Sequence, residues 1–499
     1  MMSNLIATST LLSCLALPAL GQTPMPAFVP RQVWPMPTGV LQVDVDGDGT
    51  VEFVRGHLFL FVSQGPAMTC RRVFGNGSWQ DFPPFQSLAS PSGITYHYPI
   101  AAADVDVDGD GHADVFVSRG DGPPPMPWPD QLLMGDGQGG FTESVGRLPA
   151  QPTQPVQLVG QSAVFFDLDR DGDQDLLLCS DPVLLVYEND GTGHFTDATA
   201  VRIVGSVWAR CLLVLDADLD GDLDVMTGGS TTELLQNDGT GVFHPTVQST
   251  TGWCHDLFAV DMNGDGHDDV LAIYSSLQRV YLATANSPVL AQAPHLLPNQ
   301  GVNFSGQANA VLDFDGDGDL DFFLGITTLT SQLWENSGTG MVDATNRMPL
   351  SNSSGITSPL VGDYDLDGDM DLFLGSTPIS GQQVILSSTI REAVTAASPV
   401  RGATYTVDFY AQTGHVMLVA LGLGATNVPF PGIGRLYLDP TVSVHLGALS
   451  YASWMAQPYS VTIPNLPWIV GMTIGMQGLD IDPGSGEMHM TNCPFELIQ

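Results

Sequence analysis

Short apolar runs alternate with polar, glycine-rich turns along most of the chain. Residues 212–215 and 311–312 are apolar runs that lead into acidic turns, and residues 176–178 and 322–324 are apolar runs that follow such turns. Apolar runs this short, bounded by turn residues, are typical of β-strands rather than helices. The pattern therefore predicts a repeating unit of strand, acidic turn and strand.

A second turn, rich in Asn, Gly and Thr, follows in most units. It occupies residues 189–193, 237–241 and 336–340, with a looser version at 135–140. Asp-Gly and related pairs favour tight hairpins between antiparallel strands. Each unit is therefore expected to hold two hairpins, which means four strands.

The acidic turn fits the pattern D-x-[DN]-x-D-G-x-x-[DE] and occurs seven times. Its copies begin at Asp44, Asp106, Asp167, Asp216, Asp261, Asp313 and Asp363. They are 45 to 62 residues apart, a period that indicates a repeat architecture. Seven four-stranded units predict an all-β fold, a seven-bladed β-propeller, which closes into a ring and protects its sheet edges. The seventh unit is short of strands, so we expect residues 27–34 to complete it.

The nine-residue turn has the chemistry of a calcium loop. Ca²⁺ binds about six to eight oxygen atoms, so a short loop needs carboxylates at alternating positions and a glycine where the backbone turns. We expect side-chain oxygens from loop positions 1, 3 and 5, a backbone carbonyl from position 7 and both carboxylate oxygens from position 9. An EF-hand is excluded because position 12 holds Arg55, Val117 and Leu178 in the first three copies rather than Glu.

These positions give the candidate ligands of up to seven Ca²⁺ ions. Loop by loop, they are Asp44, Asp46, Asp48, Thr50 and Glu52; Asp106, Asp108, Asp110, His112 and Asp114; Asp167, Asp169, Asp171, Asp173 and Asp175; Asp216, Asp218, Asp220, Asp222 and Asp224; Asp261, Asn263, Asp265, His267 and Asp269; Asp313, Asp315, Asp317, Asp319 and Asp321; Asp363, Asp365, Asp367, Asp369 and Asp371. Asn263 is the one substitution in the acidic pattern, and it keeps an oxygen but loses a charge.

The charge of the chain is concentrated in these loops. The formal net charge is −40, yet 43% of the residues are apolar and only 14% are charged, which is a foldable composition. Because 32 of the 54 acidic residues lie in the loops, fold stability is expected to depend on calcium. All 14 basic residues are arginines without a basic cluster, which argues against binding to nucleic acids or anionic lipids.

The acidic loops and the N-D-G-T-G-x-F hairpins at 189–195 and 237–243 resemble the FG-GAP/VCBS repeats of integrin α-subunit propellers and of many secreted bacterial proteins. The resemblance covers about residues 30–395. It implies a seven-bladed propeller, assigned here to residues 22–395, with a Ca²⁺ in the first hairpin of each blade. The fifth and seventh units depart from the pattern because they lack a clear D-G-x-G hairpin.

The two ends of the chain differ from the repeats. Residues 1–21 contain an apolar run closed by small residues, which predicts a signal peptide cleaved after Gly21, and a poor lipoprotein-type box at 11–14 is the alternative. The protein is thus expected to be secreted or at the cell surface, and no later apolar run is long enough for a transmembrane span.

Alternating stretches after Ser398 predict a small β-sandwich-like domain at 398–499, similar to C-terminal β modules of secreted proteins.

Removal of the signal peptide leaves Cys70, Cys179, Cys211, Cys254 and Cys493, an odd number. Cys179 and Cys211 lie on neighbouring repeats and could pair, and buried thiols are the alternative. No C-x-x-C spacing occurs, so a zinc site is not indicated.

In integrin-like propellers the ligand binds on the face opposite the cation loops. Residues about eight positions before each loop should reach that face, and they include Tyr98, Trp208 and Trp253, with Arg210 and His255 nearby. Aromatic rings with a few polar neighbours suit sugar rings or an extracellular protein partner. Packing between blades, or closure of the central channel, is the alternative role.

Three classes of function follow. The favoured one is a recognition or adhesion module for a carbohydrate or a surface protein, in which calcium is structural. The alternatives are a calcium-dependent polysaccharide-degrading enzyme, lyase or hydrolase, and a purely structural surface scaffold. The sequence contains no G-x-S-x-G, H-E-x-x-H or phosphate-binding glycine loop, so we assign no catalytic and no cofactor-binding residue.

Overall fold

The computed structural model describes five strands within residues 28–81 and then residues 105–499 with gaps, of which the longest are at 118–129, 150–158, 299–307, 326–330, 349–355, 363–368, 377–383 and 452–456. The predicted signal peptide lies outside the described residues. Almost all regular structure is antiparallel β-sheet. No helix among the described residues is long and apolar enough to cross a bilayer.

Six sheets of four strands and one of three are formed by the repeat region that the structure describes. In chain order they consist of β2–β5 (Val40–Val43, Glu52–Gly56, Met68–Val73, Trp79–Asp81); β6–β8 (Val115–Val117, Gln131–Gly135, Phe141–Glu143); β9–β12 (Val159–Phe166, Asp175–Asp181, Val183–Asn189, Phe195–Asp197); β13–β16 (Cys211–Leu215, Asp224–Gly228, Thr232–Asn237, Phe243–Ser249); β17–β20 (Cys254–Val260, Asp269–Tyr274, Gln278–Leu282, Ala291–Gln292); β21–β24 (Ala308–Leu312, Asp321–Gly325, Gln332–Asn336, Met341–Asp343); and β25–β27 (Ile356–Gly362, Asp371–Ser376, Val384–Ser388) with β1 (Phe28–Val33).

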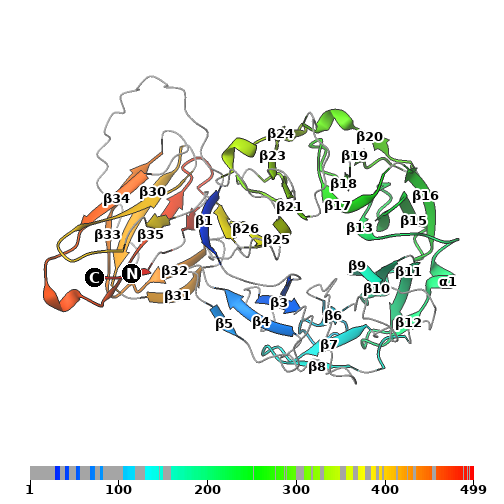
Figure 1. Ribbon diagram of the computed structural model, residues 1–499, viewed down its shortest axis with the longest axis horizontal. Helices are drawn as coiled ribbons and strands as arrows, with labels where there is room; N and C mark the ends of the chain where they lie inside the picture. Colours follow the sequence, from blue (N-terminus) through cyan, green and yellow to red (C-terminus); the bar gives the residue numbers. More distant parts are fainter. Residues whose placement is uncertain are drawn as a thin grey trace.

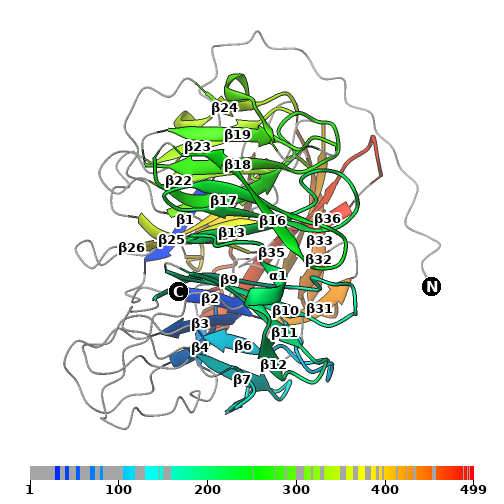
Figure 2. The same cartoon turned by 90° about the vertical axis from the view of Figure 1, so that its right-hand side faces the viewer.

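The sheets stand around a common centre (Figure 1). Strands β9, β13, β17, β21 and β25 lie nearest that centre, and β12, β16, β20 and β24 lie at the outside. Figure 2 shows the same arrangement from the side. Strand β1 pairs with β27, so a strand from the beginning of the chain completes the last sheet, as the sequence predicted.

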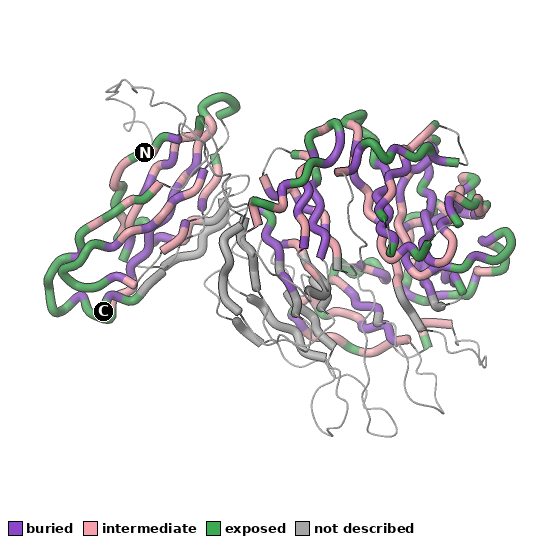
Figure 3. Tube along the Cα trace, turned by 45° about the horizontal axis from the view of Figure 1, so that its top comes forward, coloured by how far each residue is buried: buried purple, intermediate pink, exposed green. Residues whose placement is uncertain are grey.

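The hydrophobic core is divided among the seams between neighbouring sheets. One cluster joins Leu271 and Val280 to Phe322 and Trp334, and each seam with described side chains has a cluster of the same kind. Buried residues accordingly run along the strands while exposed residues gather in the turns (Figure 3). Each sheet is therefore stabilised mainly by its two neighbours in the ring.

Four turns predicted as hairpins are confirmed. They connect β7 to β8, β11 to β12, β15 to β16 and β23 to β24. Short helical turns follow some of these hairpins or lie between other strands: α1 (Thr199–Arg202), η1 (Pro294–Leu296), η2 (Thr345–Arg347) and η3 (Pro467–Ile469).

The C-terminal residues form a separate group of sheets beside the ring (Figure 1). These sheets are built from β28 (Ala393–Thr395), β29 (Thr404–Phe409) and β34 (Gln457–Thr462); from β33 (Ser443–Ser450), β30 (Val416–Gly422), β35 (Thr473–Ile481), β36 (Met488–Met490) and β37 (Phe495–Leu497); and from β31 (Ala425–Phe430) and β32 (Gly434–Leu438). The first two of these sheets share one core that includes Val407, Val419 and Met476. Strand β28 falls within the range assigned to the repeats from sequence, but it pairs with β29.

Candidate metal centres and an exposed aromatic cluster

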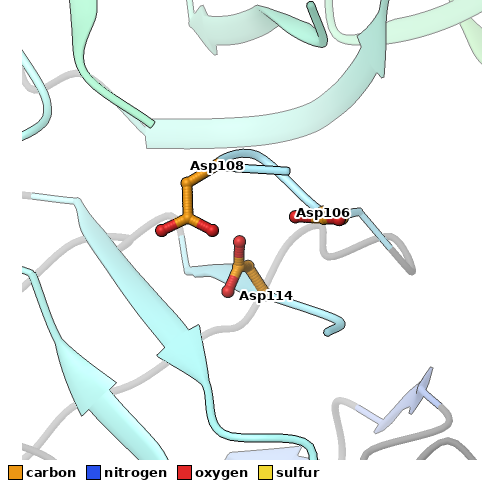
Figure 4. A group of neighbouring side chains, drawn as sticks. All are labelled: Asp106, Asp108 and Asp114. Carbon is orange, nitrogen blue, oxygen red and sulfur yellow. The ribbon is translucent and has the colours of Figure 1, made fainter. Parts of the chain in front are cut away.

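Three aspartates converge in each of four acidic loops. The groups are Asp106, Asp108 and Asp114; Asp167, Asp169 and Asp175; Asp216, Asp218 and Asp224; and Asp313, Asp315 and Asp321. Within each group, one carboxylate oxygen per residue lies within 4.8 Å of the others. The residues occupy loop positions 1, 3 and 9, and Figure 4 shows the second loop, whose three carboxylates face a common point.

The aspartate at position 9 begins the strand that leaves the loop, and it is buried. Asp175 accepts hydrogen bonds from the backbone N–H groups of Leu168, at 3.2 Å, and Asn189, at 2.9 Å. The equivalent residues Asp114, Asp224, Asp269 and Asp321 make the same two kinds of bond. In the four groups with three aspartates, each oxygen at position 9 therefore accepts one backbone N–H and keeps a second lone pair for a cation.

Position 1 shapes the loop and position 5 lies at its edge. Asp106 accepts hydrogen bonds from the N–H groups of Gly109 and Gly111, each at 2.7 Å, which closes the turn around its carboxylate. Asp110, at position 5, accepts the N–H of His112 at 2.9 Å. Position 5 is not part of the four convergent groups, so the structure brings together positions 1, 3 and 9 of the predicted ligands.

Position 3 carries the observation that points most directly to a cation. The Oδ1 atoms of Asp108, Asp169 and Asp218 are buried and accept no hydrogen bond from the described residues. A buried carboxylate oxygen without a donor is costly, because ionised oxygens need a positive partner when water is removed. A cation at the convergence point of each group would supply that partner.

Burial raises the pKa of the position 9 carboxyls. The pKa is about 6 for Asp114, about 7 for Asp175 and Asp224, and about 8 for Asp321. The backbone N–H bonds oppose this shift, and the neighbouring aspartates of the loop add to it. Without a cation, the groups thus hold more negative charge than the site accommodates at neutral pH.

Arginines at the second hairpin contact three of the loops, which the sequence did not reveal. Arg202 lies 2.5 Å from Asp169 and also contacts Glu188, and its Nη1 donates to the carbonyl of Thr240 in the next sheet at 2.5 Å. Arg147 makes the same connection between Asp108 and Thr192, and Arg347 contacts Asp315 and Glu335. Each arginine follows a hairpin by a few residues, and only the fold places it at a loop.

The fifth loop differs in its third position. Asn263 Nδ2 donates to Asp269 Oδ2 at 3.2 Å, so the amide takes the place of a carboxylate beside position 9. In the seventh loop Asp369 and Asp371 are described and buried, whereas Asp363, Asp365 and Asp367 lie outside the described residues. Asp44, Asp46, Asp48 and Thr50 of the first loop, and Asp317 of the sixth, also lie outside them.

An aromatic cluster lies at the opposite end of the inner strands from the loops. Trp208 precedes β13 and Trp253 precedes β17, while the loops follow these strands. The two indole rings pack edge to face with centroids 5.9 Å apart, and each residue is 41% exposed. The guanidinium of Arg210 lies over the Trp253 ring at 5.3 Å. Two side chains predicted to share a face are thus neighbours, whereas Tyr98 lies outside the described residues.

His255 completes this cluster. Its Nε2 lies 2.8 Å from Ser275 Oγ. Burial lowers the pKa of His255, so its imidazole is neutral at pH 7 and can both donate and accept a hydrogen bond. The cluster thus combines two apolar ring surfaces, one cation and one neutral polar ring.

The FG-GAP-like repeat family matches residues 106–178, 167–227 and 313–374. The chain contains FG-GAP-like repeats. Each matched segment begins at the first aspartate of an acidic loop and ends in or just after a strand that leaves a loop. In these FG-GAP-like repeats the three convergent aspartates are the first, third and ninth loop residues.

Solved structures are similar at low identity, and no curated protein matches the sequence. A lectin from Agrocybe aegerita that recognises non-reducing terminal N-acetylglucosamine is 14% identical, with a TM-score of 0.46 over 74% of this chain and 90% of that one. BBS1N in complex with ARL6DN is 11% identical, with a TM-score of 0.46 over 73% and 98%. YCF48 from Cyanidioschyzon merolae is 11% identical, with a TM-score of 0.36 over 71% and 98%.

Proposed function

We propose that this protein is a secreted or surface-displayed recognition module built on a calcium-stabilised, seven-bladed β-propeller. The propeller extends from β1 to β27, and strands β28 to β37, within residues 393–499, form a C-terminal β-sandwich-like domain. The ring of antiparallel sheets, the pairing of β1 with β27 and the FG-GAP-like repeats support this architecture.

Calcium is the cation that fits the acidic loops best. Every convergent side chain offers oxygen, and no sulfur or imidazole ligand belongs to the four groups. Oxygen-only sites suit hard cations such as Ca²⁺, and extracellular calcium modules bind at roughly 10⁻⁴ to 10⁻³ M. The role of the ion is structural, since its ligands connect the strands on either side of each loop to the hairpin that follows.

Calcium titration of the metal-stripped chain tests this assignment. About seven bound ions and a marked rise in melting temperature are expected, one ion for each acidic loop. Asp218→Ala should lower the stoichiometry by one, whereas Asp238→Ala, which removes an exposed carboxylate outside the loops, should leave it unchanged. Binding of one or two ions without stabilisation would contradict the proposal.

The aromatic cluster is the observation that carries the recognition function. Two half-exposed indole rings, held edge to face beside an arginine, form an apolar surface with polar groups at its edge. Tryptophan rings pack on the apolar faces of sugars and on protein side chains, while Arg210 and His255 can bind hydroxyl or carboxylate oxygens. The calcium loops hold the opposite ends of the same strands and thereby fix the cluster.

A glycan array and a panel of extracellular proteins, probed with the calcium-loaded chain, should reveal the ligand. The double variant Trp208→Ala, Trp253→Ala should weaken binding by at least about tenfold, because aromatic anchors dominate such interfaces. Trp468→Ala is the matched control, since Trp468 is 68% exposed but lies in η3 of the C-terminal region. A folded double variant that keeps full binding would contradict the assignment of the binding site to the aromatic cluster.

A further inference from the structure

Cys211 and Cys254 lie at the same point of the seam between two neighbouring sheets. Cys211 is the first residue of β13 and Cys254 the first residue of β17. The backbone N–H of Cys254 donates to the carbonyl of Gly229, 2.9 Å away, at the end of β14. The two cysteines thus start the inner strands of adjacent sheets, and both side chains belong to the core that these sheets share.

The two sulfurs face each other across a space that a glycine leaves open. A Cβ on Gly228 would lie 2.5 Å from Cys211 Sγ and 2.8 Å from Cys254 Sγ, so both sulfurs flank one position. A hydrogen bond to Cys254 raises the pKa of the Cys211 thiol well above its usual value. Both sulfurs therefore lie beside the same residue, at the seam between two neighbouring sheets, and a disulfide needs such proximity.

We propose that Cys211 and Cys254 form a disulfide bond that links two adjacent sheets near the centre of the ring. This pairing differs from that of Cys179 with Cys211, which the sequence suggested beside the alternative of buried free thiols, the state in which the structure describes Cys179, Cys211 and Cys254. Cys179 lies in the core of the preceding seam, whereas Cys211 and Cys254 share a core cluster. Sequence spacing could not distinguish the two partners, because both lie on neighbouring repeats of Cys211.

Bond formation needs a small disulfide, such as oxidised glutathione, as oxidant. One cysteine thiolate attacks the small disulfide, which forms a mixed disulfide and releases one small thiol. The second cysteine thiolate then attacks the protein sulfur of the mixed disulfide and releases the second small thiol. Two cysteine protons and two electrons end on the two small thiols, so the reaction balances. Cys211 and Cys254 are 8% and 1% exposed, so exchange takes place during folding and the finished bond is shielded.

Peptide mapping of the full chain tests the bond without any substitution. The chain is folded with oxidised and reduced glutathione, the remaining thiols are alkylated, and the protein is digested without reduction. Mass spectrometry should find one peptide pair joined through Cys211 and Cys254. Alkylation of both residues, or a link between Cys211 and Cys179, would overturn the proposal.

Melting temperatures give an independent measurement. The oxidised chain should melt roughly 5 °C above the reduced chain, since a cross-link restricts the unfolded state. Cys254→Ala should abolish this difference, and Cys493→Ala, a cysteine of the C-terminal region, should retain it. Equal melting temperatures of the oxidised and reduced wild-type chains would count against the bond.

Discussion

At the scale of single residues, the acidic loops place positions 4 and 6 in the left-handed region, and position 6 is glycine in each described case. Position 4 is glycine in the second and fifth loops, where Gly109 and Gly264 have φ of +73°. In the third and fourth loops the same position holds Arg170 and Leu219, with φ of 65° and 57°. A side chain in this conformation costs about 1–2 kcal/mol. The backbone of the third and fourth loops is therefore strained at position 4, whereas that of the second and fifth loops is not.

Leu219→Gly should therefore stabilise the protein by up to about 1 kcal/mol, because glycine adopts this backbone conformation without a steric cost. Leu223→Gly is the control: Leu223 lies in the same loop and has no positive φ, so the change should destabilise by about 0.5–1 kcal/mol. Urea unfolding of the two variants and the wild type measures both effects. Destabilisation of equal size in both variants would show that the backbone at Leu219 is not strained.

Some contacts of single residues at the loops could not be predicted from the sequence. The repeated spacing identified the loop carboxylates, but it did not show that position 9 is occupied by backbone N–H groups while position 3 keeps an open oxygen. It also missed Arg147, Arg202 and Arg347, which reach the loops only after the chain has turned through a hairpin. Contacts of this kind depend on where the next strand lies, and no local pattern encodes that.

At the scale of elements, the second hairpin of three units connects its sheet to the preceding one. The Nδ2 atoms of Asn189, Asn237 and Asn336 donate to loop carbonyls of the preceding sheet at 2.8, 3.2 and 3.0 Å. The Oδ1 atom of Asn237 accepts the N–H of Gly241 at 2.9 Å within its own turn. The asparagine that begins the N-D-G-T-G motif thus closes its hairpin and joins two sheets.

Asn237→Ala should destabilise the protein by about 2 kcal/mol, because buried donors and acceptors of two sheets lose their partner. The adjacent Asp238→Ala should cost less than about 1 kcal/mol, since Asp238 is exposed and its side chain contacts Thr240 and His244 of its own hairpin. Thermal melting in saturating calcium separates these effects from metal binding. Similar losses in the two variants would show that the bridge between sheets contributes little.

At the scale of the whole molecule, stability is linked to pH through the buried carboxylates. The pKa of Asp175 and Asp224 is raised to about 7 and that of Asp321 to about 8, above the ordinary value near 4 that holds in the unfolded chain. Between these values the unfolded chain has lost protons that the folded chain still binds. The stability of the metal-free protein therefore falls as the pH rises from about 4 to about 8.

We expect the metal-free protein to melt at a higher temperature at pH 5 than at pH 8. Calcium should reverse the order, because the ion binds the ionised carboxylates and competes with protons. Melting scans at both pH values, with a chelator and with excess calcium, test the direction of the pH dependence in the metal-free and the calcium-bound protein. A metal-free protein that is more stable at pH 8 would show that the loop carboxylates are not protonated in the fold.

The sequence by itself determined the local features of this protein. The period of the acidic loops, the strands on either side of them and the second hairpins are encoded within a few residues, because turn chemistry and apolar runs act locally. Only the tertiary structure decided which distant residues meet. It paired β1 with β27, packed Trp208 edge to face against Trp253 and set Cys211 and Cys254 on either side of Gly228. The physical reason is that each sheet must bury its faces against two neighbours, so the closing of the ring decides these contacts.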